Sequence, residues 1–240
     1  MSLSNDLPNS IGYWYGTDSK EIFDNNWGPD RFNKRTRELL ISNGFTQDTV
    51  IEYQLDHYGL RNEPNVDIGN SLLALGCSYT FGNGLDINDT WASQLGKLTD
   101  ISVYNAGISG SSNDTAFRLA NYLIPKYKPQ AVFLLSPFKF RYEFYEGTTY
   151  YNYTASKGAV WIEPTVEMAS DLHNELNAEK NILAIKSLCD REHIPFIWLS
   201  INDLEPVDFD FARDLAHVGR KAHDLVAIKM KQLFEESLDK

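Results

Sequence analysis

The sequence has 240 residues and a formal net charge of −11; 42% of its residues are hydrophobic and 13% are aromatic. This composition is typical of a globular chain that buries a core, and it excludes an intrinsically disordered one. The negative charge repels nucleic acid and anionic lipid, so we expect neither nucleic acid nor a membrane as a partner.

The N-terminal residues and the cysteines bear on the compartment. Residues 1–16 are polar and contain no apolar stretch of signal-peptide length. No run in the chain reaches the roughly 18 apolar residues of a membrane span. Two cysteines, Cys77 and Cys189, leave a single disulfide open but give no framework of the secreted kind. We therefore expect a soluble, cytoplasmic protein.

Residues 1–66 are polar and aromatic, with little periodicity. They hold too few aliphatic side chains for a core of their own, so we predict an extension packed on the rest of the chain. Within it, residues 31–42 predict a short helix that ends near Asn43 and Gly44. Residues 26–29 indicate a loop, and residues 49–55 alternate enough to predict a strand.

Residues 67–240 alternate apolar runs with stretches of helical periodicity. This spacing predicts an α/β fold, namely a three-layer α/β/α sandwich around a mostly parallel, flavodoxin-like sheet. The expected strands are residues 72–75, 101–104, 131–135 and 194–200. The expected helices are residues 89–98, 115–127 and 170–191, and a last one that begins near residue 213 or 218 and runs to residue 233.

A stretch rich in aromatic and charged side chains interrupts this alternation after residue 137. We predict a lid-like insertion at about residues 138–165, with Arg141 and Tyr142 as candidate substrate-binding residues. Long ordered loops are often functional, so the insertion is interpreted either as the wall of a substrate cleft or as a packed surface loop. A contact between copies of the chain is equally open, which leaves a homo-oligomer among the expectations.

Ser78 is the candidate nucleophile. It follows the apolar run of residues 72–75, which breaks at Gly76 and is succeeded by turn-prone residues. Ligands of α/β proteins gather at the carboxyl ends of such strands, so Ser78 stands where a nucleophile would be displayed. Two alternatives remain: a tight turn without chemistry, and Cys77 as the nucleophile.

A serine that acts at neutral pH needs a base, and the base needs an orienting carboxylate. Asp214 and His217 lie three residues apart before the last predicted helix, a separation that puts both side chains on one face of a helix-like turn. The alternative is that Asp214 caps the helix and His217 is a surface histidine. Together with His223 and Asp224, they match no strong metal-ligand spacing, so we expect no metal and no cofactor.

An oxyanion hole needs donors aimed at the developing negative charge. Residues 105–110 read Asn-Ala-Gly-Ile-Ser-Gly and lie between a predicted strand and a predicted helix. Gly110 can bring its backbone N–H close to a ligand because no side chain stands in the way. A plain strand-to-helix turn is the alternative interpretation of this stretch.

These blocks, in this order, resemble the SGNH, or GDSL-type, hydrolase family. Gly76, Cys77 and Ser78 resemble its first block, Gly-Asp-Ser, with Cys in place of Asp. Residues 105–110 resemble its second block, Asn-x-Gly-x-x-Gly, and residues 214–217 its last block, Asp-x-x-His. The resemblance covers residues 72–233.

The resemblance implies a serine esterase that cleaves a short acyl or acetyl group from a small-molecule or carbohydrate alcohol. It assigns the nucleophile to Ser78, the base to His217 and the orienting carboxylate to Asp214. The backbone N–H groups of Ser78 and Gly110 would then form the oxyanion hole.

One block of the family is missing. The third block, Gly-x-Asn-Asp, supplies a side-chain amide to the oxyanion hole, but residues 136–141 read Ser-Pro-Phe-Lys-Phe-Arg. Lys139, Arg141 or the amide of Asn113 are the candidates to replace that donor. The alternative function is therefore a protein of the SGNH fold that binds a glycan or another ligand, or assembles with a partner, without catalysis.

Overall fold

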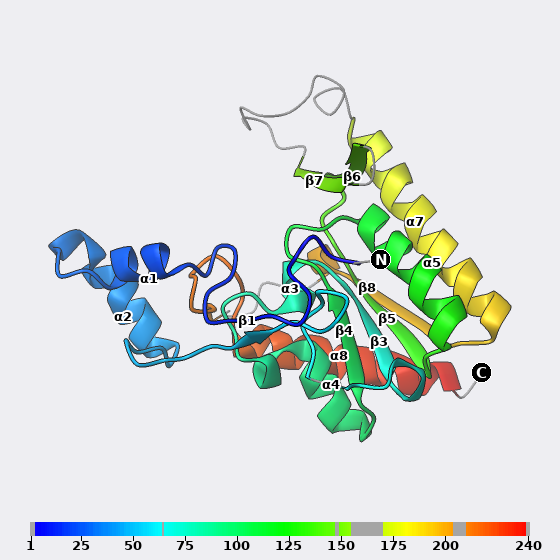
Figure 1. Ribbon diagram of the computed structural model, residues 1–240, viewed down its shortest axis with the longest axis horizontal. Coiled ribbons are helices and arrows are strands. Elements are labelled where there is room, and N and C mark those ends of the chain that lie inside the picture. Colours follow the sequence, from blue (N-terminus) through cyan, green and yellow to red (C-terminus); the bar gives the residue numbers. More distant parts are fainter. Residues whose placement is uncertain (1–2, 64, 147–148, 155–169, 204–209, 239–240) are drawn as a thin grey trace.

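The structure is a computed structural model that describes residues 3–63, 65–146, 149–154, 170–203 and 210–238. Its centre is a sheet of four parallel strands, β3 (Leu72–Gly76), β4 (Val103–Gly107), β5 (Ala131–Ser136) and β8 (Phe196–Ser200). The strands lie in the order β4-β3-β5-β8 (Figure 1), so the first strand in the chain is flanked by the second and third. This is the flavodoxin-like order.

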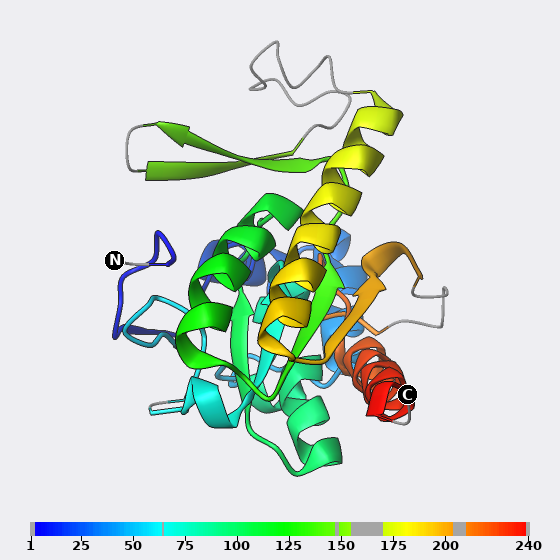
Figure 2. The ribbon, with the colours of Figure 1, turned by 90° about the vertical axis from the view of Figure 1, so that its right-hand side faces the viewer.

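Helices cover both faces of this sheet. They are α4 (Trp91–Thr99), α5 (Asn113–Tyr127), α7 (Asp171–Glu192) and α8 (Arg220–Leu238). Figure 2 shows α5 and α7 in front of the sheet, while α4 and α8 lie on the other side. Two buried clusters fill the layers between, one beneath α5 and α7 and one beneath α4 and α8. The predicted three-layer α/β/α sandwich is confirmed.

Burial on both faces explains the uninterrupted apolar runs of β3 and β5. Every residue of either strand is buried, as expected for a parallel strand covered by helices on both sides.

Polar residues cap the first turns of two of the helices. The Thr90 hydroxyl accepts the Ser93 N–H at the start of α4, and the Ser170 hydroxyl accepts the His173 N–H at the start of α7.

Three predicted boundaries are wrong. The strand expected at residues 101–104 is β4 at residues 103–107, because the stretch interpreted as a turn pairs with the end of β3, with Asn105 opposite Ala74. The last helix begins at Arg220, because residues 211 and 218 close a loop through an isolated bridge. The strand expected at residues 49–55 is reduced to β2 (Tyr53–Gln54), which pairs with β1 (Ile11–Gly12).

Residues 3–63 hold two α-helices, α1 (Lys20–Trp27) and α2 (Lys34–Ser42), that project to one side of the sheet (Figure 1). Helix α1 was not predicted, and α2 lies within the helix expected at residues 31–42. These residues contribute to two buried clusters: Leu3 and Leu60 pack with α5, and Tyr53 packs with Phe81. The division of the chain near residue 66 stays a prediction.

An antiparallel hairpin of β6 (Arg141–Glu146) and β7 (Thr149–Thr154) occupies much of the predicted insertion and stands above α5 and α7 in Figure 2. Its base is attached to α5, since Glu143 accepts hydrogen bonds from Arg118 Nε at 2.8 Å and from Thr115 Oγ1 at 2.7 Å. Residues 155–165 of the predicted insertion lie outside the described residues. Within the described helices, none combines the length and the apolar character needed to cross a membrane.

Candidate active site

Ser78 is the first residue of the short helix α3 (Ser78–Phe81), which follows β3 directly. The turn between them is tight: a Cβ atom on Gly76 would lie 2.2 Å from Thr80 Oγ1 and 2.7 Å from the Leu135 carbonyl oxygen. Only glycine fits there, so the break after the apolar run is required by close packing. The turn holds Ser78, which is 3% exposed, at the carboxyl end of β3.

The side chains of Ser78, His217 and Asp214 form one hydrogen-bonded chain. His217 Nε2 lies 2.8 Å from Ser78 Oγ, and His217 Nδ1 lies 2.6 Å from Asp214 Oδ2. Ser78 and His217, which form the first of these contacts, lie 139 positions apart in sequence. The structure therefore brings together the three side chains that the sequence singled out.

Asp214 lies in a loop, and backbone contacts fix the direction of its carboxylate. Its Oδ1 accepts the backbone N–H groups of Ala216 and His217, each at 3.0 Å. Leu215, the residue after Asp214, has a φ of 53°. The arrangement differs from the helix-like turn that the spacing suggested, but it places Asp214 and His217 on the same side of the loop.

The Asp214 carboxylate keeps its charge although it is buried. Burial on its own would raise its pKa. The hydrogen bond and charge of His217, the Thr17 hydroxyl and the Ala216 N–H outweigh burial and hold the pKa of Asp214 below its ordinary value. Asp214 is therefore ionised at neutral pH and accepts hydrogen bonds from all of these donors.

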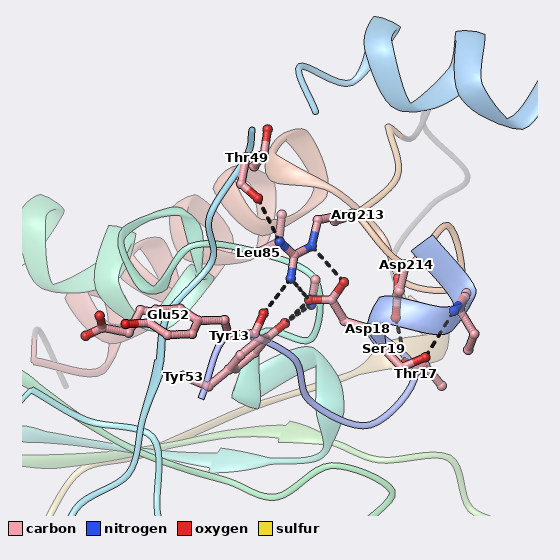
Figure 3. Close-up of polar contacts among 12 residues, drawn as sticks. Tyr13, Thr17, Asp18, Ser19, Thr49, Glu52, Tyr53, Leu85, Arg213 and Asp214 are labelled. Carbon is pink, nitrogen blue, oxygen red and sulfur yellow. Dashed lines mark hydrogen bonds and ion pairs between the residues drawn. The ribbon is translucent and has the colours of Figure 1, made fainter. Parts of the chain in front are cut away.

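Thr17 and Asp18, from the N-terminal part of the chain, support the Asp214 loop (Figure 3). Thr17 Oγ1 donates to Asp214 Oδ2 at 2.6 Å. Arg213, next to Asp214, donates to the two carboxylate oxygens of Asp18 at 2.8 and 2.6 Å, and both side chains are 1% exposed. Tyr53 donates a further hydrogen bond to Asp18 at 2.6 Å.

Sequence reasoning missed these supporting residues. The run Thr17-Asp18-Ser19 precedes α1, where Ser19 accepts the Ile22 N–H as an ordinary helix cap. Thr17 lies 197 positions from Asp214, and Asp18 lies 195 positions from Arg213. No local pattern in the sequence links partners this far apart.

Gly110 lies in the loop after β4 with a φ of 74° and an open face. No heavy atom lies within 4 Å of the place that a Cβ would take. The loop is tied to the Ser78 turn, since Ser111 Oγ donates to the Gly76 carbonyl oxygen at 3.1 Å. Asn105 at the centre of β4 donates to the Thr80 carbonyl oxygen at 2.8 Å and so braces α3 from the other side.

Three of the four other candidate residues are engaged within the fold. Lys139 is exposed, and its Nζ lies 3.2 Å from Glu175 Oε1. Asn113 is buried, donates to the Pro137 carbonyl oxygen at 3.3 Å and accepts the Ser136 hydroxyl at 2.9 Å. Tyr142 donates its hydroxyl hydrogen to Asn174 of α7 and stacks on His173.

Arg141 is the remaining candidate. Its guanidinium carbon lies 5.1 Å from the centre of the Phe138 ring. Tyr79, the residue after the candidate nucleophile, packs edge-on against that ring at 6.2 Å and against the His217 ring at 5.6 Å. The aromatic rings thus link Arg141 to His217 along one side of the site.

Cys77 and His223 take no part in the hydrogen-bonded chain. The Cys77 thiol is fully buried in the apolar cluster that contains Trp91, and both cysteines are free. His223 accepts the Trp91 backbone N–H at 2.9 Å, and burial lowers its pKa to about 3, so its ring is neutral. In the part of the chain that the structure describes, no group of three or more His, Cys, Asp or Glu side chains could hold a metal ion.

No family model matches the sequence, and no curated protein matches it. Solved structures similar to the chain include the psychrotrophic esterase EstA from Pseudoalteromonas sp., with 15% identity, a TM-score of 0.44 and coverage of 71% of this chain and 100% of that chain. TesA has 15% identity, a TM-score of 0.49 and coverage of 69% and 98%, and the lipase/acylhydrolase from Enterococcus faecalis has 12% identity, a TM-score of 0.38 and coverage of 69% and 96%. At such identities and TM-scores the similarity assigns neither chemistry nor substrate to this chain.

Proposed function

We propose that the protein is a serine ester hydrolase of the SGNH type, with Ser78 as the nucleophile, His217 as the general base and Asp214 as the orienting carboxylate. One observation carries the proposal: the unbroken chain of hydrogen bonds from Ser78 Oγ through both ring nitrogens of His217 to Asp214 Oδ2. A hydroxyl, an imidazole and a carboxylate in this order are what activation of a serine requires.

In this mechanism His217 Nε2 takes the proton of Ser78 Oγ while the oxygen attacks the ester carbonyl carbon. The imidazolium then gives that proton to the leaving alcohol, which leaves the acyl group on Ser78. A water molecule, deprotonated by His217, releases the acid and restores the serine. Asp214 stays ionised throughout because its pKa is held low, and it stabilises the imidazolium.

The oxyanion of the tetrahedral intermediate would be bound by the backbone N–H groups of Ser78 and Gly110. Within the described residues, neither N–H donates a hydrogen bond to a backbone acceptor outside regular helices and strands. Ser78 begins α3, so its N–H needs no partner within that helix. The open face of Gly110 lets a substrate approach its backbone.

The substrate that we propose is a small ester with a short acyl or acetyl group, on a small-molecule or carbohydrate alcohol. The closed apolar gap next to Tyr79 favours a short acyl group over a long one. Trp91, Leu135 and His223 are among the residues that line this gap, and it has no room for a water molecule. A long acyl chain therefore has no channel into the core there.

A non-catalytic ligand-binding protein of the same fold is the second candidate. The observation that favours it is the stretch of residues 136–141, which supplies no side-chain amide, while Lys139 contacts Glu175. Loss of one oxyanion donor costs about 10²- to 10³-fold in turnover, which would leave binding as the main activity.

A fluorophosphonate probe, followed by mass spectrometry of the labelled peptide, separates the two candidates. The hydrolase hypothesis expects a label on Ser78 that is lost in Ser78→Ala and retained in Cys77→Ala. Cys77→Ala is the matched control because it changes the adjacent side chain, which is buried outside the hydrogen-bonded chain. A folded wild-type protein that takes no label would overturn the hydrolase hypothesis in favour of the binding protein.

A further inference from the structure

Arg141 reaches across the carboxyl end of β3. It follows the loop after β5, and its Nη1 lies 3.5 Å from the carbonyl oxygen of Ser111, in the loop after β4. Ser111 Oγ in turn donates to the carbonyl oxygen of Gly76, the last residue of β3, so Arg141 lies near the strand end that presents Ser78. The Phe138 ring lies between Arg141 and Tyr79, the residue after Ser78. Burial raises the pKa of Tyr79, and the positive charge of Arg141 acts against that rise.

The charge of Arg141 is not neutralised by a carboxylate in the described part of the chain. Its hydrogen bond to Ser111 is long, and its Nε is buried without an acceptor. Its guanidinium also lies over the face of the Phe138 ring. A guanidinium in this state has N–H donors left for an incoming group.

The carboxylates nearest in sequence and on the adjoining helix are already engaged. Glu143, two residues along β6, accepts two hydrogen bonds from Arg118, at 2.8 and 3.0 Å. Asp114 accepts the Asn181 amide at 2.7 Å and the Glu143 backbone N–H at 3.1 Å. Neither carboxylate is therefore left over to pair with Arg141.

Two buried arginines show how this fold engages a guanidinium that serves the structure, although the Nε of Arg61, like that of Arg141, has no partner. Arg61 donates from its two Nη atoms to four backbone carbonyl oxygens, those of Glu52, Phe81, Gly82 and Leu85. Arg213 forms the ion pair with Asp18 and donates to two further carbonyl oxygens. Among the described residues Arg141 has no ion pair and one long contact from Nη1 to a carbonyl oxygen, so its Nη atoms are engaged far less than those of Arg61 or Arg213.

We propose that Arg141 binds a carboxylate carried by the ester substrate, so that the site prefers anionic esters over neutral esters of the same size. The preference rests on the proposed function of Ser78. A guanidinium binds carboxylates through charge-assisted, often paired hydrogen bonds. Its single positive charge matches a monoanionic carboxylate better than a dianionic phosphate. The chain as a whole is acidic, at −11, so this cation is a local feature and not part of a basic surface.

The test compares two matched pairs of esters. The first pair is 4-nitrophenyl hydrogen succinate and 4-nitrophenyl butyrate, which carry or lack a carboxylate on the acyl side. The second pair is 4-acetoxybenzoate and its methyl ester, which carry or lack one on the alcohol side. The measured quantity is the ratio of kcat/KM between the anionic and the neutral ester of each pair.

In Arg141→Gln we expect that ratio to fall about tenfold or more in at least one pair, the scale of a hydrogen bond to a charged group. Lys139→Gln is the control, since it removes one positive charge from the same loop but from an ammonium that contacts Glu175. There we expect the ratio to stay within about twofold, as for an exposed ion pair. A ratio that stays unchanged in both pairs in Arg141→Gln would overturn the proposal, whether or not kcat/KM itself falls.

A binding experiment keeps this proposal distinct from the proposed hydrolysis. Calorimetric titration of Ser78→Ala with the two anionic esters measures binding without turnover. We expect Ser78→Ala with Arg141→Gln to bind the preferred ester about tenfold or more weakly. If wild type shows no Ser78-dependent hydrolysis but this difference persists, the hydrolase hypothesis fails and the carboxylate site stands. Equal binding by the two proteins overturns the carboxylate site, whatever the turnover.

Discussion

Replacing Asp214 with asparagine tests the tautomer of His217. Oδ1 of Asp214 accepts two backbone N–H groups, so in Asp214→Asn the amide oxygen must take that place. The amide nitrogen is then left where Oδ2 was, 2.6 Å from His217 Nδ1. Because that nitrogen is a donor, Nδ1 must accept and the ring proton moves to Nε2. His217 can then no longer take the proton of Ser78.

The expected cost is about 10⁴-fold in kcat, the effect of the equivalent change in a serine protease triad. This corresponds to about 5.5 kcal/mol in the activation free energy. The assay is steady-state hydrolysis of 4-nitrophenyl acetate by wild type and Asp214→Asn, with thermal unfolding to check that both are folded. A folded Asp214→Asn protein that keeps more than about a tenth of the wild-type kcat would refute the tautomer reasoning and the role of Asp214.

Other substitutions test the support of the site. Thr17→Val removes one hydrogen bond from the Asp214 carboxylate, worth about 1.5–3 kcal/mol shared between folding and catalysis, so kcat falls more than KM changes; Thr17→Ser restores it, and equal kcat in all three proteins would contradict a positioning role. Asp18→Asn unpairs the buried Arg213 and lowers the free energy of unfolding in urea by about 3–5 kcal/mol; a loss below about 1 kcal/mol would show that the pair is not needed. Gly110→Ala strains a φ of 74° by about 1–2 kcal/mol and places a Cβ on the open face by which a substrate would reach the Gly110 backbone, so kcat/KM falls while the protein stays folded; an unchanged kcat/KM would contradict an approach of the substrate to that face. Because the pKa of Asp214 is depressed on folding, its carboxylate stabilises the fold above its unfolded pKa of about 4 and loses this contribution as the pH falls through the folded value; unfolding free energies of Asp214→Asn therefore depend less on pH below about 4, and an unchanged dependence would contradict the assignment.

The sheet was predictable from the sequence where burial alone determines the pattern. β3 and β5 are apolar throughout because helices cover both faces, and their predicted bounds differ from the structure by one residue at the carboxyl end. β4 was misplaced because its second half reads Asn-Ala-Gly, which is typical of a turn. That half is a strand because it pairs with β3, and a Cβ on Gly107 would lie 2.4 Å from the Phe81 backbone nitrogen. Close packing between distant residues decides this segment.

The candidate triad was predictable because its residues lie in blocks with an order and a spacing. Where a side chain of a loop or a hairpin points cannot be predicted from such blocks. Lys139 and Tyr142 were predicted near the substrate, but the first contacts Glu175 and the second packs on α7. Arg141, from the same stretch, lies near the end of β3. Its contact with Ser111 shows this position, whereas Lys139 and Tyr142 contact residues of α7.

The hydrogen-bonded chain joins two parts of the molecule that are held by different forces. Packing between β3 and its neighbours fixes Ser78, whereas the loop of Asp214 and His217 is attached through Arg213 to Asp18. A buried ion pair contributes little more to stability than an apolar pair of similar size would. The two parallel hydrogen bonds of this pair, however, hold the Arg213 side chain in one orientation relative to Asp18. Asp214 is the next residue, so its backbone is held as well. We infer that the ion pair sets the direction in which Asp214 faces His217, which an apolar contact could not do.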